Sequence, residues 1–248
     1  MICLIFASCT TSRNLIYLSD LKNVREYDEE IKNKVDTKIY PDDLLSITVS
    51  SLNPEANILF NNGTIQSGTT NSLAASSKAN EGYLVDKNGS INFPVLGKVK
   101  LGGLTKEQAI EKMTSEIKNH VKNPIVNIRF INFRITVIGE VTHPSTFTIP
   151  NERINIIEAL GLAGDMTAYG KRENMLIIRE KEGVRSVVKV DLTNKDILNS
   201  PYFYLQQNDI LYVEPARIKQ LQSSSSTFYV PLISAAVSIL SLVIIIFK

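Results

Sequence analysis

The sequence predicts an α+β fold, in which two small modules of mixed strands and helices precede a C-terminal transmembrane helix. Two capping boxes predict one helix in each module, and short runs of apolar and β-branched residues around each helix predict strands. The third observation is an uncharged run of 20 residues, 228–247, at the end of the chain. Short strands around a single helix are typical of α+β modules with mixed sheets.

The first module opens with a predicted strand over residues 44–49, whose apolar side chains alternate. Residues 61–80 are poor in bulky apolar side chains and rich in Asn, Ser, Gly and Thr, so they predict a long flexible loop. The stretch after this loop, 83–93, predicts a hairpin of two strands joined by a turn at Asn88-Gly89.

The helices are predicted from their N-termini. Thr105 and Gln108 have the spacing of a capping box that opens a helix over 106–120, and Asn155 and Glu158 open a shorter one in the second module. An Asn-Pro pair ends the first helix, and a glycine closes the second. The remaining predicted strands cover residues 125–130, 135–140, 175–179, 187–190 and 210–213.

The C-terminal run is long enough to cross a bilayer, since 20 helical residues at about 1.5 Å each reach about 30 Å. Ser234, Ser238 and Ser241 recur at spacings of four and three, so they share one face of this helix. A serine face favours packing against other helices or lining a water-filled pore. The alternative is a lone anchor in lipid, whose serines bond back to their own backbone.

The N-terminus is also apolar, and it stops at Phe-Ala-Ser before Cys9. This stretch resembles a bacterial lipobox, in which the cysteine is acylated, although no Lys or Arg precedes it. We therefore expect residues 1–8 to be the remnant of a lipoprotein signal peptide and Cys9 to be lipidated. The alternative is a free cysteine in a disordered terminus. Residues 15–38 mix charges of both signs with few apolar residues, which predicts a solvated tether.

Several motifs, taken in order, resemble the polysaccharide biosynthesis/export family, the Wza-like outer-membrane lipoproteins in their Bacteroidetes-type variant. The second module resembles the soluble-ligand-binding β-grasp (SLBB) domain. The motifs begin at Tyr40 (YPDDLLSITV), Gly82 (GYLVDKNGSINFPVLG), Leu104 (LTKEQA), Val137 (VIGEVTHP), Ile156 (IIEALGLAGD) and Tyr204 (YLQQNDILYV). Asp42-Asp43 and Asn208-Asp209 stand where the family usually has Gly-Asp, so a tight turn at each must tolerate a side chain.

On this basis the chain divides into five segments. They are the signal-peptide remnant 1–8, the lipidated N-terminus and tether 9–39, the polysaccharide export domain 40–132, the SLBB domain 133–221, and the hinge with its transmembrane helix 222–248.

The resemblance implies export of a capsular or loose exopolysaccharide through the outer membrane. Several copies would form a ring-shaped homo-oligomer whose bodies stand in the periplasm and whose C-terminal helices together cross the membrane. The implied partners are the exported polysaccharide, outer-membrane lipid, and an inner-membrane polysaccharide co-polymerase or tyrosine-kinase-type protein. Two alternatives remain. One is a periplasmic adaptor, anchored at both ends, that binds glycan or protein without forming a pore; the other is an inner-membrane enzyme subunit.

Composition and motifs give no sign of catalysis, cofactor binding or nucleic-acid binding. The net charge is +2 and the basic residues are dispersed, so no basic stripe is present. His120 and His143 have no cysteine partners that would make a zinc site. The acidic runs at 42–43 and 28–30 are explained by a turn and by the tether, although two acids are all that a glycosidase needs. We therefore expect no enzyme, no cofactor and no metal site.

Overall fold

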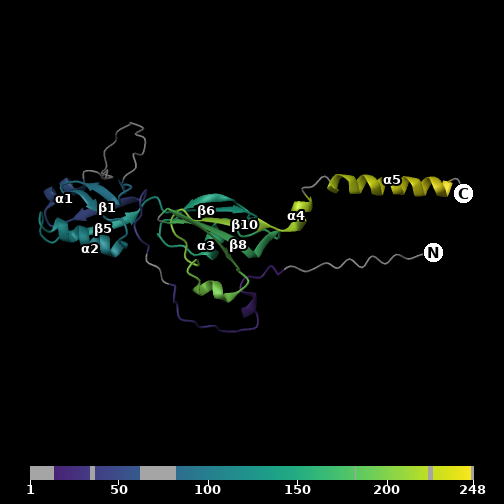
Figure 1. Cartoon of the computed structure of the whole chain (residues 1–248), viewed down its shortest axis with the longest axis horizontal. Helices are drawn as coiled ribbons and strands as arrows, with labels where there is room; N and C mark the ends of the chain where they lie inside the picture. Colours follow the sequence, from purple (N-terminus) through teal and green to yellow (C-terminus); the bar gives the residue numbers. More distant parts are fainter. Residues whose placement is uncertain (1–13, 34–36, 62–81, 182, 223–225, 247–248) are drawn as a thin grey trace, which may run out of the picture.

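The computed structural model describes residues 14–33, 37–61, 82–181, 183–222 and 226–246. Two α+β domains lie end to end, and a long C-terminal helix extends from the second domain, away from the first (Figure 1). The prediction of mixed strands and helices is confirmed. The predicted lipidation site Cys9 and the predicted loop 61–80, apart from Asn61, lie outside the described residues.

The first domain contains a three-stranded sheet, a two-stranded sheet and two helices, α1 and α2. Its elements are β1 (Leu44–Ser50), α1 (Pro54–Asn61), β2 (Tyr83–Leu84), β3 (Ser90–Phe93), β4 (Gly97–Lys100), α2 (Lys106–Ile117) and β5 (Ile125–Phe130). The strand order is β2-β1-β5, all antiparallel, so β1 is central. Leu45, Ile47 and Val49 of β1 are buried, as their alternation predicts.

The predicted capping box of α2 is confirmed. The backbone N–H of Gln108 donates to Thr105 Oγ1 (3.3 Å), and the Thr105 N–H donates to Gln108 Oε1 (3.0 Å). The helix ends at Ile117, three residues before its predicted end. Ala109, Met113 and Ile117 are fully buried, which places one face of α2 in the core of the domain.

The predicted hairpin over 83–93 is wrong in its strand pairing, although its turn exists. Gly89 has a φ of 74°, and the Asp86 carboxylate accepts the N–H groups of Asn88 and Ser90 (both 2.8 Å). The strands on either side pair elsewhere: β2 with β1, and β3 with β4. An Asn-Gly turn reverses the chain locally, but it does not decide which strand each arm joins.

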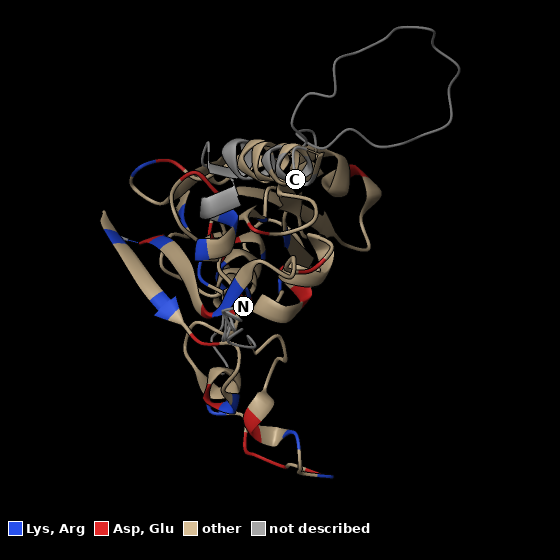
Figure 2. Ribbon diagram, turned by 90° about the vertical axis from the view of Figure 1, so that its right-hand side faces the viewer, with Lys and Arg blue, Asp and Glu red and all other residues tan. Residues whose placement is uncertain are grey.

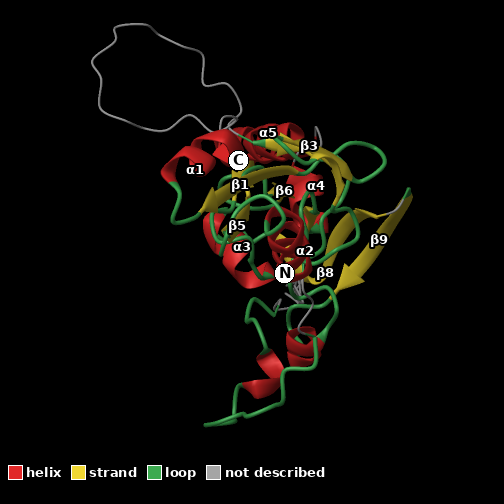
Figure 3. Cartoon of the chain, turned by 90° about the vertical axis from the view of Figure 1, so that its left-hand side faces the viewer, coloured by secondary structure: helices red, strands yellow, loops and turns green. Residues whose placement is uncertain are grey.

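The second domain is a five-stranded mixed sheet with one helix against it. Its elements are β6 (Arg134–Gly139), β7 (Ser145–Thr148), α3 (Ile156–Leu162), β8 (Gly170–Lys181), β9 (Val184–Val190), the 3-10 helix η2 (Lys195–Asn199) and β10 (Ile210–Pro215). The strand order is β7-β6-β10-β8-β9, in which only β6 and β10 are parallel. The capping box of α3 is confirmed, with Asn155 and Glu158 bonding each other's backbone. Figure 3 shows β8 and β9 extending as a long hairpin at one side.

The N-terminal segment is not the solvated tether that its charges predict. Residues 14–33 are largely exposed, but they lie along the second domain, where they include the short 3-10 helix η1 (Ser19–Leu21). The Leu18 N–H donates to Leu192 O (2.9 Å), and Asn33 Nδ2 donates to the carbonyls of Leu198 (2.8 Å) and Ser200 (2.7 Å). These partners are about 170 residues away along the chain, so local charge patterning could not reveal them.

The C-terminal residues form α4 (Arg217–Gln222) and α5 (Ser226–Ile246). Figure 2, a view toward the C-terminal end of the molecule, shows Lys and Arg interspersed with Asp and Glu over the body and none on the drawn part of α5. Among the residues that the structure describes, no helix is both long enough and apolar enough to span a membrane. The sequence prediction of a spanning helix over 228–247 is therefore not supported, and several side chains of this run lie outside the described residues.

Candidate functional site

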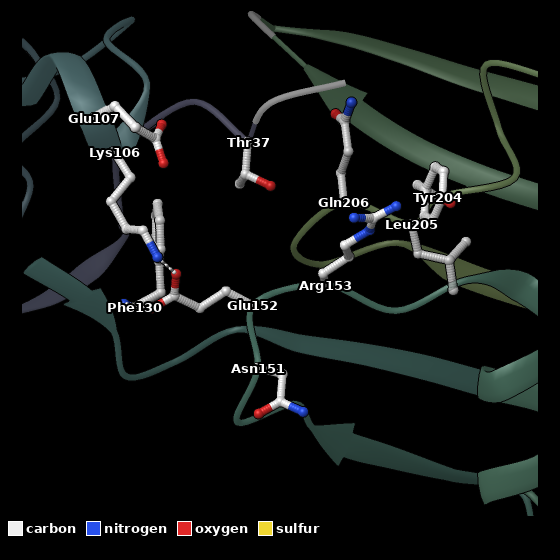
Figure 4. A pocket seen from close by; sticks show the side chains of 10 residues that line it. All are labelled: Thr37, Lys106, Glu107, Phe130, Asn151, Glu152, Arg153, Tyr204, Leu205 and Gln206. Carbon is white, nitrogen blue, oxygen red and sulfur yellow. Dashed lines mark hydrogen bonds and ion pairs between the residues drawn. The ribbon is translucent and has the colours of Figure 1, made fainter. Parts of the chain in front are cut away.

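The seam between the two domains brings together polar residues that lie far apart in the sequence. From the first domain come the turn before β1, the start of α2 and the end of β5. From the second come the loop between β7 and α3 and the turn before β10. Figure 4 shows the start of α2, the end of β5, the β7–α3 loop and the segment before β10 around one pocket, together with Thr37. Two hydrogen bonds of Glu152, three of Asn132 and one cavity describe the seam.

Glu152 clamps the second domain to the first. It lies in the β7–α3 loop, and its side chain is only 11% exposed. Oε1 accepts the Phe130 N–H at the end of β5 (2.8 Å), while Oε2 accepts a bond from Lys106 Nζ in the first turn of α2 (2.7 Å). The φ of Glu152 is 56°, a conformation that a glutamate adopts at some cost. Both oxygens of this carboxylate therefore bond to the first domain and hold the β7–α3 loop against it.

Asn132, in the short link between β5 and β6, joins the turns of the two domains. Its Oδ1 accepts the Leu44 N–H (2.8 Å) and a bond from Gln207 Nε2 (3.1 Å), while its Nδ2 donates to Asp42 O (3.0 Å). One amide thus bonds the turn before β1 and the turn before β10.

Each of these two turns holds a buried aspartate. Asp43 accepts the Tyr40 N–H through Oδ2 (2.7 Å), and burial, with a smaller effect of the nearby Asp42 charge, raises its pKa to about 7. Burial also raises the pKa of Asp209, but there the Arg179 guanidinium opposes it. The residues before them, Asp42 and Asn208, have φ of 70° and 64°. Side chains therefore occupy both positions where the family usually has glycine, as expected from the sequence.

A pocket of about 180 Å³ lies beside the Glu152 clamp. The residues of its wall that carry charge or hydrogen-bonding groups include Lys106, Glu107, Glu152, Arg153, Tyr204 and Gln206. The Arg153 guanidinium carbon lies 4.2 Å from the centroid of the Tyr204 ring, so the cation stacks on the aromatic face. Arg153 and Gln206 come from the second domain and face Lys106 and Glu107 of the first across the pocket (Figure 4).

The predicted serine face is remote from this seam. Ser234, Ser238 and Ser241 lie exposed on α5. The Ser238 hydroxyl donates to Ser234 O and the Ser241 hydroxyl donates to Ser238 O, both at 2.8 Å. Within one chain, these two serines therefore bond back to their own helix. Sequence reasoning missed the seam residues, because nothing in their local sequence marks Glu152, Arg153 or Asn132.

The described residues contain no group of three or more His, Cys, Asp or Glu side chains that could hold a metal ion. His143 donates its backbone N–H to Ala163 O (2.8 Å) and so helps to hold the turn after α3. Asp42 and Asp43 lie in a turn of the seam, as expected from the sequence.

Comparison with known proteins agrees with this two-domain arrangement. Residues 32–130 match the family model described as polysaccharide biosynthesis/export protein, and residues 134–213 match the SLBB domain. The EPS I polysaccharide export outer membrane protein EpsA of Ralstonia solanacearum is 28% identical over 195 residues, 77% of this chain and 51% of the relative. EpsA of Ralstonia nicotianae is 30% identical over 178 residues, 69% of this chain and 45% of the relative.

The chain thus spans about half the length of these curated relatives. The matched family is an export family rather than an enzyme family, which agrees with the expectation that this chain is not an enzyme. The order of the two matched domains also follows the order of the motifs along the chain. This chain belongs to the polysaccharide biosynthesis/export family and carries an SLBB domain after its export domain.

Proposed function

We propose that this chain exports polysaccharide across the outer membrane as the subunit of an oligomeric conduit. The observation that carries the proposal is the export domain followed by the SLBB domain, in a chain that is similar to relatives named as outer-membrane export proteins. The bonded seam supports it, because a conduit built from repeated subunits needs each subunit to keep one shape.

The arrangement of the ends supports attachment of the chain to one membrane at two points. Residues 14–33 lie along the second domain, and α4 and α5 lead away from that same domain (Figure 1). A lipid on Cys9 and a membrane-embedded α5 would therefore reach the same bilayer. In this orientation the first domain points into the periplasm, toward the proposed inner-membrane partner, a polysaccharide co-polymerase or tyrosine-kinase-type protein.

The surface of α5 supports its insertion in the outer membrane together with other copies. Leu232, Ile233, Val237 and Ile239 are 53–63% exposed, so no part of the described chain covers them. Exposing such a surface to water is unfavourable by about 25 cal/mol for each Å². Lipid on one face and neighbouring α5 helices on the other would remove that cost, with the serine face turned toward the neighbours or a lumen.

Export itself is tested by deleting the coding sequence and measuring surface polysaccharide by carbohydrate assay and immunostaining. We expect surface polymer to be lost and restored by the full-length chain, and a Cys9→Ser variant to restore it poorly. Unchanged surface polymer in the deletion strain would refute the export role. Co-purification with the co-polymerase from a crosslinked strain tests the partner.

The conduit is tested on the detergent-extracted protein and in cells. We expect a ring by electron microscopy, and labelling of Ser234→Cys, Ser238→Cys and Ser241→Cys by a water-soluble thiol reagent in intact cells. Ile233→Cys and Ile239→Cys are the matched controls and should be protected by lipid. Equal protection at all five positions would rule out a serine-lined lumen.

The adaptor without a pore remains the second candidate. The observation that favours it is the bonding of Ser238 and Ser241 to their own backbone, which leaves α5 without need of a polar partner. A stable monomer in detergent, together with normal fractionation to the outer membrane, would support the adaptor over the conduit.

A further inference from the structure

We propose that the pocket beside the Glu152 clamp binds one acidic sugar unit, carrying a carboxylate, of the polysaccharide that the chain exports. This inference rests on the proposed export function for the source of the ligand, but the pocket itself is defined by the seam. It assigns a binding role to Arg153, which lies outside the sequence motifs, and to Gln206, which lies within the motif that begins at Tyr204.

The first argument is charge. The pocket wall carries the carboxylates of Glu107 and Glu152 and the cations of Lys106 and Arg153. The Glu152 carboxylate is already bonded by Lys106 and by the Phe130 N–H, so its charge is balanced within the protein. The Arg153 side chain is exposed, and within the described residues it has no carboxylate or hydrogen-bond partner, only the Tyr204 ring. Stacking on that ring holds the guanidinium plane while its N–H groups stay available. A planar fork of donors matches a carboxylate in two parallel bonds.

The second argument is the distribution of donors and acceptors. Arg153 and Gln206 face the pocket from one domain, and the Glu107 carboxylate faces it from the other (Figure 4). The Gln206 side-chain amide has no bonded partner in the described part of the chain, whereas its backbone N–H and carbonyl both bond to Asp209. A sugar presents hydroxyl groups that both donate and accept. It can therefore place a carboxylate on Arg153 and hydroxyls on Gln206 and Glu107 at once.

The third argument is size. A volume of about 180 Å³ is below the roughly 300–1,000 Å³ of sites for drug-sized ligands. The pocket therefore suits a single sugar unit of a longer chain rather than a whole oligosaccharide. A site that binds one unit at a time binds weakly. Weak binding suits transport, because the polymer must also leave each site that it contacts.

The test uses the full-length protein in detergent and two trisaccharides of equal length, trigalacturonate and neutral maltotriose, titrated by saturation-transfer NMR. We expect trigalacturonate to bind at least about tenfold more tightly, because charge-assisted hydrogen bonds contribute most of the affinity. Arg153→Gln should weaken trigalacturonate binding about tenfold, and Gln206→Ala should weaken it less. Arg185→Gln, which removes the same charge from the β8–β9 hairpin, is the matched control and should bind as the parent does.

Equal affinity for the two trisaccharides, or unchanged binding by both Arg153→Gln and Gln206→Ala, would overturn the acidic-sugar site. The two proposals fail separately. If the parent binds trigalacturonate through Arg153 but the deletion strain still exports its polymer, the export function is refuted and the site stands. If export depends on the chain but Arg153→Gln binds normally, only the site is refuted.

Discussion

The turn that leads into β1 of the first domain has the same backbone bonds as the turn that leads into β10 of the second. In the first, the Asp43 N–H donates to Tyr40 O (3.3 Å) and its carboxylate accepts the Tyr40 N–H. In the second, the Asp209 N–H donates to Gln206 O (3.2 Å) and its carboxylate accepts the Gln206 N–H (2.7 Å). Both turns introduce the central strand of a sheet, and both aspartates are buried.

The two turns differ in how the buried charge is balanced. Arg179 in β8 donates to both oxygens of Asp209, from Nε (2.9 Å) and from Nη2 (2.7 Å). Among the described residues, the Asp43 carboxylate accepts a bond from the Tyr40 N–H alone, and its pKa is raised to about 7. The same backbone turn is thus neutralised by a cation in the second domain and, near neutral pH, partly by a proton in the first. Mutation of Arg179 should therefore destabilise the turn before β10, whereas the stability of the turn before β1 should depend on pH.

The largest expected effect comes from removing the cation. Arg179→Gln leaves the Asp209 carboxylate buried without its ion pair, which should lower the free energy of unfolding by about 3–5 kcal/mol at pH 7. The loss should be smaller at lower pH, because burial raises the pKa of Asp209 and the variant lacks the guanidinium that opposes this shift. Urea unfolding of the full-length chain followed by circular dichroism measures both.

Arg185→Gln is the control for this variant. Arg185 pairs with Glu180 on the same hairpin, but the two side chains are 70% and 64% exposed. Water screens such a pair, so its loss should cost less than about 1 kcal/mol. If the two arginine variants were equally stable, the buried pair would not be what stabilises the second turn.

The second prediction concerns pH. The folded-state pKa of Asp43, about 7, is above its ordinary value of 3.8, so between these values the folded chain binds more protons than the unfolded chain. The contribution of Asp43 to stability is therefore full below about pH 4, falls as pH rises, and is lost above about pH 7. Asp43→Asn keeps an oxygen for the Tyr40 N–H and cannot ionise. Relative to the parent, it should gain stability as pH rises from 4 to 8, by up to about 4 kcal/mol.

Unfolding of parent and variant at pH 4, 6 and 8 measures this difference directly. Other carboxylates, such as Asp86 and Glu214, have lowered pKa values and add the opposite trend to both proteins, so only the difference between them is informative. A difference that stays constant with pH would show that Asp43 is ionised in the folded protein throughout.

The third prediction concerns Asn132, whose side chain bonds to both turns. Asn132→Ala removes the bonds to the Leu44 N–H, to Gln207 and to Asp42 O, and should cost about 1 kcal/mol because it leaves the partly buried Leu44 N–H without its acceptor. Asn132→Asp keeps the acceptor but loses the donor, and should cost less than Ala at pH 7. If Asn132→Ala leaves stability unchanged but alters small-angle X-ray scattering, the amide sets domain orientation only.

Whether a sequence prediction is correct depends on how far apart the interacting residues lie along the chain. The capping boxes at Thr105 and Asn155 were predictable, because both partners lie three residues apart and each pattern has one common structural meaning. The alternation in β1 predicted its buried face for the same reason. Positive φ at Asp42 and Asn208 could be anticipated from the family's usual Gly-Asp, since a glycine there marks a backbone requirement.

Contacts between distant segments could not be predicted in this way. The pairing of β2 with β1, the place of residues 14–33 and the clamp from Glu152 to Phe130 all join segments that are far apart in the sequence or in different domains. The candidate pocket belongs to this class, because Lys106 and Arg153 approach each other only once the domains are docked. A surface arginine in a loop is unremarkable in sequence, and only its stacking on Tyr204 marks it.

The smallest predicted effect on stability comes from replacing the positive-φ residue of each turn, Asp42 or Asn208, with glycine. Asp42→Gly should stabilise the chain by up to about 1 kcal/mol, because glycine adopts a φ of 70° without strain and no side-chain bond of Asp42 is lost among the described residues. Asn208→Gly should have almost no net effect. Asparagine tolerates this conformation better, and its Oδ1 accepts a bond from Arg134 Nε (3.2 Å) that glycine cannot replace. Thermal unfolding of the two variants compares them, and a larger gain for Asn208→Gly than for Asp42→Gly would show that strain in the second turn outweighs that bond.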